Sequence, residues 1–489
     1  MRSPRGDDAD ALARQLGTGR HGSKSELSPS EKGRRRHRRA LAALLALCLL
    51  RAARVSYVRA DETTRALAHL FYQAPVILIA AVWLWGANLF LWHLCCFDPH
   101  PLVVFQLEDA RAHLTHTRVW GVAYACTLFY LASVTLFLRF ANAETYSLEG
   151  GPSLDATQRG FVAAHICAIA THVAPALALC APLERWYPQT RRCLRRTIAR
   201  CLTPWRRPVS FADFFLADVL CSLAKALSDA ERTACAALAG PAAMFDRARD
   251  ARFGACGSAS LHVPLMLALP SVIRLAQCLR QARDGGALAE SLRGENRPSA
   301  GEAVEGKRVA KRNALKYCSA FPVVVLSHLK YSVSSGTWTS LVRPCWVACA
   351  AANTAYSIYW DVTYDWDLRL APALARECFG SAGAAGAANV SADDADDCER
   401  TRSVPSLQRK YLRSRLLYGD LNVYFAAVVA NAALRLTWTY KLSSHLRHNA
   451  GTVLAFAALE ITRRFLWSMF RVEKAYLARG GTGTQDLPR

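Results

Sequence analysis

Long apolar runs recur along the chain and are separated by short charged segments. The clearest runs span residues 74–96, 119–138, 161–183 and 340–360. Each has roughly the 20 residues that an α-helix needs to cross the hydrocarbon core of a bilayer. A soluble chain of 489 residues would instead spread polar residues along every element of its domains. The pattern therefore predicts an all-α, polytopic helical membrane protein with about ten transmembrane helices in one bundle.

The first apolar run, at 40–58, gives the weakest signal. It follows the basic stretch RRRHRR at 34–39 and is interrupted by Arg51 and Arg54. A basic stretch before a short apolar run also describes a signal peptide, but no convincing small-residue cleavage site follows. We interpret 40–58 as a poor first span, and a signal peptide stays open as the alternative.

Composition divides the chain into a membrane domain and two tails. Residues 1–36 are rich in Arg, Ser, Gly and Asp, which predicts a disordered basic tail. Residues 37–475 form the predicted membrane domain, and 476–489 form a C-terminal tail. Within the domain we expect two basic loops and one flexible Ala/Gly-rich loop, at 183–210, 280–314 and 371–405.

Charge is distributed unevenly between these loops. The chain has 61 Lys and Arg residues against 38 Asp and Glu residues, a net charge of +23. Because the basic residues gather by loop and not on one soluble face, we expect no nucleic-acid partner. The basic loops contrast with 141–159, which is acidic and small. The positive-inside rule thus places both ends and both basic loops in the cytosol. Segment 51–65 departs from the rule, since it carries four arginines on the predicted outer side.

Cysteine and histidine patterns give no sign of a metal or a cofactor. Most of the 17 cysteines lie in or beside apolar runs, where a free thiol behaves as a small hydrophobe. No C-x-x-C pair is present, and no metal-ligand spacing links His113, His116, His165 and His172. In the 371–405 loop, a cytosolic location argues against a bridge between Cys378 and Cys398 and against glycosylation of Asn389.

Charged residues also lie inside the apolar segments. A charge at bilayer depth costs about 2.5–3.5 kcal/mol on insertion scales, so each one needs a partner or a cavity. These segments hold Asp213, Asp218, Arg274, Lys316, Asp361, Asp365, Arg435, Glu460, Arg463 and Arg464.

Some of these charges have plain structural explanations. Asp213 lies near the start of a span and fits a helix N-terminal charge better than a ligand. Asp361 and Asp365 are four residues apart and so share one helix face. With Trp360 and Trp366 beside them, they also fit solvated acids in an interfacial aromatic belt.

The last apolar segment leaves two readings open. Glu460 can pair with Arg463 and Arg464 within one helix, at spacings of three and four. The arginines can also snorkel from a helix end to the headgroups. Arg274 and Asp218 are harder to explain in these ways, because apolar residues extend on both sides of each.

Six stretches share the order and spacing found in a known domain. They are FADFFLAD (211–218), IRLAQCLR (273–280), NALKY (313–317), YWDVTYDWDL (359–368), LRLTW (434–438) and LEITRRFLWSMFRVEK (459–474). The chain therefore resembles the EXS-domain family over roughly residues 40–475. That family includes phosphate exporters of the xenotropic and polytropic retrovirus receptor type and a related Golgi protein of the retention-defective type. Full-length exporters carry an SPX domain, which senses inositol pyrophosphates, before the spans. Here about 40 residues precede the first run, so the resemblance is to the SPX-less, Golgi-type branch.

The resemblance also implies a set of site residues. Family phosphate contacts fall on Arg274, Lys316, Tyr317, Arg435, Trp438, Arg463 and Arg464, and family acidic partners fall on Asp218, Asp361, Asp365 and Glu460. Guanidinium forks suit phosphate oxygens, and Lys adds a compact point charge. Five cations against four carboxylates leave a charge of +1, which divalent phosphate would turn to −1. Cys221, Ala224 and Asn431 depart from the residues usual in the family.

The implied function is transport of inorganic phosphate through a helical-bundle path lined by Arg and Lys with acidic partners. In a Golgi or other secretory-pathway membrane this would recycle phosphate from the lumen to the cytosol, and in the plasma membrane it would export phosphate. Expected partners are inorganic phosphate, the lipid bilayer and, as a candidate, a second copy in a homodimer.

Two further functions stay open. One is a non-transporting Golgi membrane adaptor that retains glycosyltransferases. The other is a membrane enzyme that holds a divalent metal on Asp361 and Asp365. We rank the enzyme last and predict none, because the chain has no nucleotide loop and no further carboxylate cluster.

Overall fold

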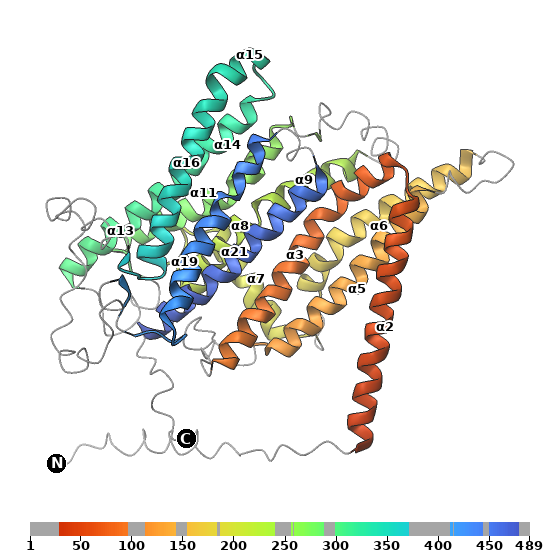
Figure 1. The fold of residues 1–489 in the computed structure, drawn as a ribbon, viewed down its shortest axis with the longest axis horizontal. Helices are drawn as coiled ribbons and strands as arrows, with labels where there is room; N and C mark the ends of the chain where they lie inside the picture. Colours follow the sequence, from red (N-terminus) through yellow and green to blue (C-terminus); the bar gives the residue numbers. More distant parts are fainter. Residues whose placement is uncertain are drawn as a thin grey trace.

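In the part of the chain that it describes, the computed structural model consists of helices joined by turns and short irregular segments, without strands, and the predicted all-α class is confirmed (Figure 1). The described residues are 29–95, 113–142, 154–182, 186–239, 256–257, 259–287, 299–370, 411–413, 415–443 and 449–478. The predicted 371–405 loop, with Cys378, Asn389 and Cys398, lies outside them, as do 1–28 and 479–489.

Four helices form the N-terminal part of the bundle. They are α2 (Pro29–Arg59), α3 (Glu62–Leu94), α5 (His116–Ala141) and α6 (Leu154–Cys180). Phe71 and Tyr72 of α3 pack edge-on against Phe137 of α5, with ring centroids 6.0 and 5.4 Å apart. The long helix α2 stands at the margin of the bundle beside α5 (Figure 1).

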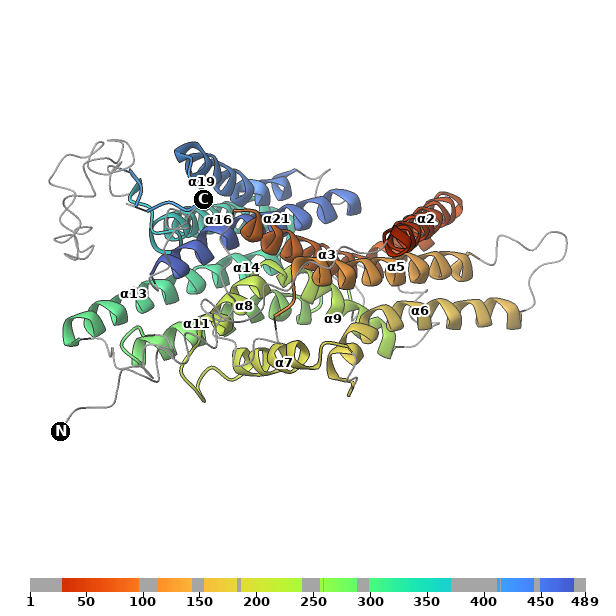
Figure 2. The ribbon, with the colours of Figure 1, turned by 90° about the horizontal axis from the view of Figure 1, so that it is seen from below.

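The remaining helices form the part of the bundle that carries most of the membrane-embedded charges. They are α7 (Pro188–Leu202), α8 (Phe211–Ser222), α9 (Ala224–Leu238), α11 (His262–Arg283), α13 (Ala300–Cys318), α14 (Ala320–Leu329), α15 (Ser335–Thr337), η3 (Trp338–Val342), α16 (Arg343–Trp360), η4 (Asp361–Asp365), α19 (Leu421–Arg435), η7 (Leu436–Leu442) and α21 (Ala450–Leu477). From below, α19, α16 and α21 lie toward one side and α7 toward the other, with α8 between them (Figure 2).

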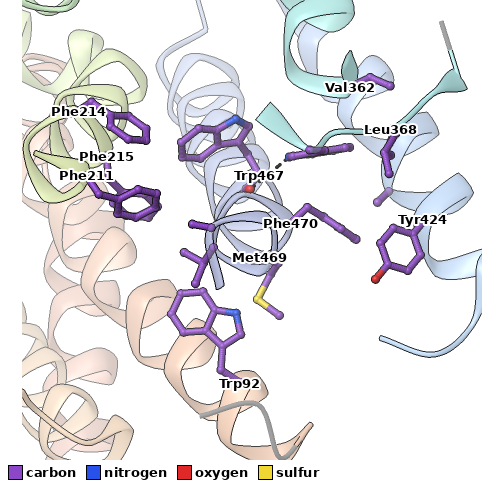
Figure 3. Packing of buried hydrophobic residues seen from close by; sticks show 14 of the residues in the cluster. Trp92, Phe211, Phe214, Phe215, Val362, Leu368, Tyr424, Trp467, Met469 and Phe470 are labelled. Atoms are coloured by element: carbon purple, nitrogen blue, oxygen red, sulfur yellow. Dashed lines mark hydrogen bonds between the residues drawn. The ribbon is translucent and has the colours of Figure 1, made fainter. Parts of the chain in front are cut away.

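An aromatic cluster fixes the C-terminal half of α21 in this arrangement (Figure 3). Trp467 packs on Phe215 of α8 at 5.6 Å between ring centroids. One turn on, Phe470 contacts Trp366 at 4.9 Å and Tyr424 of α19 at 5.2 Å. The indole N–H of Trp366 donates to the carbonyl of Trp467 at 3.3 Å. The aromatic residues of the LEITRRFLWSMFRVEK stretch therefore hold α8, η4 and α19 around one helix.

Several helices are broken or change their winding inside the apolar segments. One helix is interrupted at Leu223, between α8 and α9, and another is interrupted at Ser319, between α13 and α14. The helix α16 runs into the π-helical turn η4, and α19 runs into the 3₁₀ helix η7. The predicted helices thus exist as composite elements.

In the described part of the chain, five helices are long and apolar enough to cross a membrane by length and composition. They are Ala40–Arg59, Glu62–Leu94, His116–Ala141, Arg159–Cys180 and His262–Arg283. The composite elements α8–α9, α13–α14, α16–η4 and α19–η7, together with α21, are interrupted or carry several charges, which lowers their hydropathy. The predicted count of about ten includes these elements and stays a prediction.

Two segments that were predicted to be loops, and part of a predicted tail, form helices in the structure. The first residues of α2, 29–36, belong to the predicted disordered tail, and α7 occupies most of the predicted loop 183–210. Arg191 of α7 donates to the carbonyls of Ala178 and Ala181 at 2.8 and 2.5 Å, and so caps the C-terminal end of α6. Likewise α13 begins inside the predicted loop 280–314, at a capping box formed by Ser299.

A disulfide that the sequence did not reveal joins Cys235, near the end of α9, to Cys256, before α11. The predicted cytosolic loops precede α8 and follow α11. If α8–α9 and α11 each cross the membrane once, the bridge lies on the opposite side. Disulfides persist in oxidising compartments, so the bridge agrees with the orientation that loop charge predicts. We call the end of the bundle that carries this bridge the outer side.

We therefore expect Cys235 and Cys256 to resist alkylation in sealed native membranes until an impermeant reductant is added from the outer side. Mass spectrometry of the alkylated peptides measures this. Replacing both residues by Ser should lower the free energy of unfolding by about 2–5 kcal/mol, because the bridge no longer restricts the unfolded chain. Alkylation without reductant, or reduction only by a cytosolic reductant, would contradict the orientation.

Candidate anion-binding site

Charged side chains from six elements, most of them buried, meet at the centre of the bundle. The structure brings together Asp218 of α8, Arg274 of α11, Lys316 and Tyr317 of α13, Asp361 and Asp365 of η4, Arg435 of α19, and Glu460, Arg463 and Arg464 of α21. These residues come from sequence positions far apart, and their contacts form three adjoining groups.

The first group is built on Asp218. Its Oδ1 accepts from Nε of Arg274 at 2.9 Å and from the hydroxyl of Tyr317 at 2.5 Å. A second nitrogen of Arg274 donates to Oε1 of Gln277 at 2.7 Å. The guanidinium also lies over the rings of Phe214 and Tyr317, at 5.4 and 4.9 Å. Both charges of this pair are buried, and α8, α11 and α13 are tied together by it.

The second group is built on Asp361, which has no exposed surface. Its Oδ1 accepts from Nζ of Lys316 at 3.1 Å. Its Oδ2 accepts from Nε of Arg435 at 2.8 Å and from the amide of Asn431 at 3.2 Å. Nη1 of Arg463 lies 3.6 Å from the same oxygen. One carboxylate thus faces three cations from three helices.

The π-helical turn η4 brings a second carboxylate to the same lysine. The backbone N–H of Trp366 donates to the carbonyl of Asp361, five residues back, at 2.9 Å. Oδ2 of Asp365 lies 3.7 Å from Nζ of Lys316 and accepts from the indole N–H of Trp467 at 3.0 Å. Single π-turns inside helices are frequent at functional sites. Asp361 and Asp365 are therefore partners of buried cations and not solvated acids of an interface.

The third group contains the adjacent arginines of α21, and these two residues have different partners. Nε and Nη2 of Arg463 donate to the two carboxylate oxygens of Glu460 at 2.8 and 2.6 Å. Arg464 instead donates from Nε to the hydroxyl of Ser222 at 2.9 Å and lies 4.4 Å over the ring of Trp467. Both arginines are buried, at 1% and 8% exposure, so neither snorkels to a surface. Among the described residues, no carboxylate lies within 4.0 Å of the Arg464 guanidinium.

Trp438 lies apart from the ion pairs, at the outer end of this site. Its ring meets Trp346 edge-on, with centroids 5.6 Å apart. The indole nitrogens of both residues are buried and have no hydrogen-bond partner in the described part of the chain. Two N–H donors are therefore left for an acceptor that the described residues do not supply.

The sequence did not single out three polar residues of the site. Ser222 donates to Glu460 at 2.7 Å, and Asn431, noted only as a departure from the family, links Asp361 to Arg463. Arg471 lies 3.9 Å from Asp365 and over the rings of Phe214 and Phe211. A signal for Arg471 was available, because it follows Arg464 by seven residues and so shares its helix face.

Asp213 does not belong to the site. It forms a capping box with Ser210 at the start of α8 and pairs with Arg200 at 2.7 Å. It therefore has the role of a helix N-terminal charge.

The site is suited to an anion and not to a divalent metal. A metal between Asp361 and Asp365 would face Lys316, Arg435 and Arg463, whose charges would repel it. In the described ranges, no group of three or more His, Cys, Asp or Glu residues is placed to hold a metal ion. The buried cations instead leave donors that an oxyanion can accept.

The chain matches the model that describes the EXS family over residues 68–477. A xenotropic and polytropic retrovirus receptor 1 homolog of Danio rerio is 26% identical over 421 residues, which cover 84% of this chain and 50% of that protein. Phosphate transporter PHO1-2 of Oryza sativa subsp. japonica is 25% identical over 421 residues, covering 84% and 41%. Solute carrier family 53 member 1 of Homo sapiens is 23% identical over 437 residues, covering 86% and 52%. The chain spans about half the length, or less, of these relatives.

We expect Asp361→Asn to lower the free energy of unfolding by about 3–5 kcal/mol, because it removes the buried carboxylate that Lys316, Arg435 and Arg463 share. Asp420→Asn is the matched control. Asp420 caps the start of α19 from an exposed position, and Asn caps nearly as well. Thermal melting in one detergent compares the two variants. Equal melting temperatures would show that Asp361 does not hold the centre together.

Proposed function

The chain belongs to the EXS family, and on that premise we propose that it moves inorganic phosphate across a membrane. The path runs through the bundle of α8, α11, α13, α16, α19 and α21, past the buried cations. One observation carries the proposal: Arg464 is a buried guanidinium without a carboxylate partner in the described chain. A relative of this chain is named as a phosphate transporter, which supports the choice of anion.

Arg464 can accept a phosphate because its own contacts leave part of its fork unused. Ser222 occupies only Nε, and Trp467 occupies only one face of the planar group. A guanidinium can bind two phosphate oxygens in its plane while an aromatic ring covers its face. A buried cation that lacks a counter-ion is costly, and a bound anion would remove that cost. Arg463 has no comparable freedom, since Glu460 already binds two of its nitrogens.

Net charge supports divalent phosphate as cargo. With Arg471 included, the site has six cations against four carboxylates, a charge of +2. Divalent phosphate would bring the occupied site to zero. The carboxylates also limit how tightly the anion is held, and a conducting site must bind weakly enough to release its ion. The cations are Arg274, Lys316, Arg435, Arg463, Arg464 and Arg471, and the carboxylates are Asp218, Asp361, Asp365 and Glu460.

We place the protein in the secretory pathway, in a Golgi membrane or in the plasma membrane. The disulfide between Cys235 and Cys256 supports this location, because the segment before α11 would then face a lumen or the cell exterior. The phosphate gradient sets the direction of net transport. In a Golgi membrane, phosphate would return from the lumen to the cytosol, and in the plasma membrane it would be exported.

We expect Arg464→Lys to reduce phosphate flux by at least about tenfold, a loss of roughly 1.4 kcal/mol, because Lys keeps the charge but loses the planar fork. Stability should be unchanged, since no described carboxylate pairs with Arg464 and Lys keeps the buried charge. Uptake of labelled phosphate into proteoliposomes measures the flux. Arg280→Lys is the matched control, because Arg280 pairs with Asp284 on the same bundle outside the site.

Variants of Arg463 and Arg464 distinguish a structural role from a role in transport. Arg463→Ala should lower the melting temperature, because it leaves Glu460 and Asp361 short of a cation, whereas Arg464→Ala should lower flux without that loss. Wild-type flux in Arg464→Lys at equal protein levels would mean that the fork binds no phosphate. Absence of any phosphate flux in the wild-type protein would instead favour the adaptor function.

A further inference from the structure

The 3₁₀ helix η7 extends the cationic face of α19 toward the outer side. A 3₁₀ helix has three residues per turn, so residues three apart lie one above the other. Arg435, at the end of α19, is followed at this spacing by Trp438 and then by Lys441. An α-helical continuation would spread the three side chains around the axis. With a rise of about 2.0 Å per residue, Lys441 lies roughly 12 Å beyond Arg435 along η7.

Two contacts hold η7 between its neighbours. The ring of Tyr440 stacks on Phe456 of α21, with centroids 4.2 Å apart and planes 8° apart. Nη2 of Arg343, at the start of α16, donates to the carbonyl of Leu442 at 3.1 Å. The end of η7 is thereby fixed against α21 and α16, with Tyr440 one turn of α21 outward from Glu460 and Lys441 next to it in the chain.

The helix α9 brings a second lysine to the same level. Lys225 follows Ser222 by three residues on the outer side of the break at Leu223. Leu223 and Ala226 pack with Ile461 of α21, which places α9 against the same helix that holds η7. Nζ of Lys225 donates to both carboxylate oxygens of Asp229, one turn further out.

The charges at this level do not cancel. Both α9 and η7 pack on α21, so the two lysines lie at the same end of the bundle, and Asp229 is buried at 2% exposure. Asp229 is already engaged by Lys225, and Lys441 is exposed and makes no ion pair among the described residues. Two ammonium groups and one carboxylate leave a charge of +1 just outside the central site.

We propose that Lys441 and Lys225 form a second binding site for a phosphate anion, which we call the outer station. From there the anion passes Trp438 to reach the central site. The proposal rests on the transport function above and assigns these lysines a role in it. Lys suits such a station, because its flexible point charge attracts an anion without the two-donor grip of Arg. Trp438, with its unsatisfied indole N–H, lies between the station and Arg435 on one face.

The phosphate held there could be free or part of a lipid headgroup, since both present the same oxyanion. The phosphate of phosphatidylcholine is neutralised by the choline of its own headgroup. Proteoliposomes of phosphatidylcholine alone, and of phosphatidylcholine with phosphatidylserine, therefore distinguish free phosphate from an anionic headgroup. Labelled inorganic phosphate is presented on the outer side, and the orientation is measured by impermeant thiol labelling of Cys235 and Cys256 after reduction.

In both lipids, Lys441→Gln should raise the half-saturating concentration of phosphate by roughly fivefold, the size expected for loss of one partly exposed ionic contact. Its maximal flux should stay close to the wild-type value, and Lys441→Arg should restore the half-saturation. Lys330→Gln is the matched control, because it removes the same charge from the outer end of α14. The double variant Lys225→Gln with Asp229→Asn tests the second lysine without leaving Asp229 unpaired.

Three outcomes would overturn the station. One is a half-saturating phosphate concentration that is unchanged in Lys441→Gln while the wild-type protein transports phosphate. This outcome would leave the proposal for the central site standing. Another is an effect seen only with phosphatidylserine, which would assign the lysines to a lipid headgroup. The third is absence of wild-type flux, which would remove the transport function and the station together.

Discussion

The centre of the bundle depends on one carboxylate, that of Asp361. Lys316, Arg435 and Arg463 come from three helices, and each would repel the others in a medium from which water is excluded. Asp361 compensates all three, with an amide contact from Asn431 on the same oxygen as Arg435. The helices α13, α19 and α21 can approach one another only because η4 places this carboxylate between them. The cations that suit the site to an anion are thus held in place by an acid.

The adjacent arginines of α21 show how such a site can be stable and still bind a ligand. Successive residues of an α-helix point about 100° apart, so Arg463 and Arg464 reach different neighbours. Arg463 turns toward Glu460 and the carboxylate of Asp361, and it closes the ion-pair network. Arg464 turns toward a hydroxyl and an aromatic ring, neither of which carries a compensating charge. A single arginine could not meet both demands.

The sequence predicted the residue types and the helix class, but not which helices meet. Hydropathy locates apolar runs, and the cost of burying a charge marks Asp218 and Arg274 as needing partners. Their contact joins positions 56 residues apart, which no local pattern encodes. The bridge between Cys235 and Cys256 was missed for the same reason. The helix α7 was missed because its arginines indicate a loop, whereas Arg191 caps carbonyls of α6.

The irregular backbone beside the buried cations favours a transport path for an anion over a purely structural scaffold. Inside a bilayer every backbone polar group must be satisfied, so non-helical or rewound segments are tolerated only where protein or water surrounds them. Regular helices can also form ion pairs, as Arg463 and Glu460 do within α21. Yet the break at Leu223, the π-turn η4 and the 3₁₀ helix η7 all lie beside the buried cations. An adaptor held together by ion pairs would have no need of these interruptions. A route for a hydrated anion requires polar surroundings at that depth, and there the interruptions are tolerated.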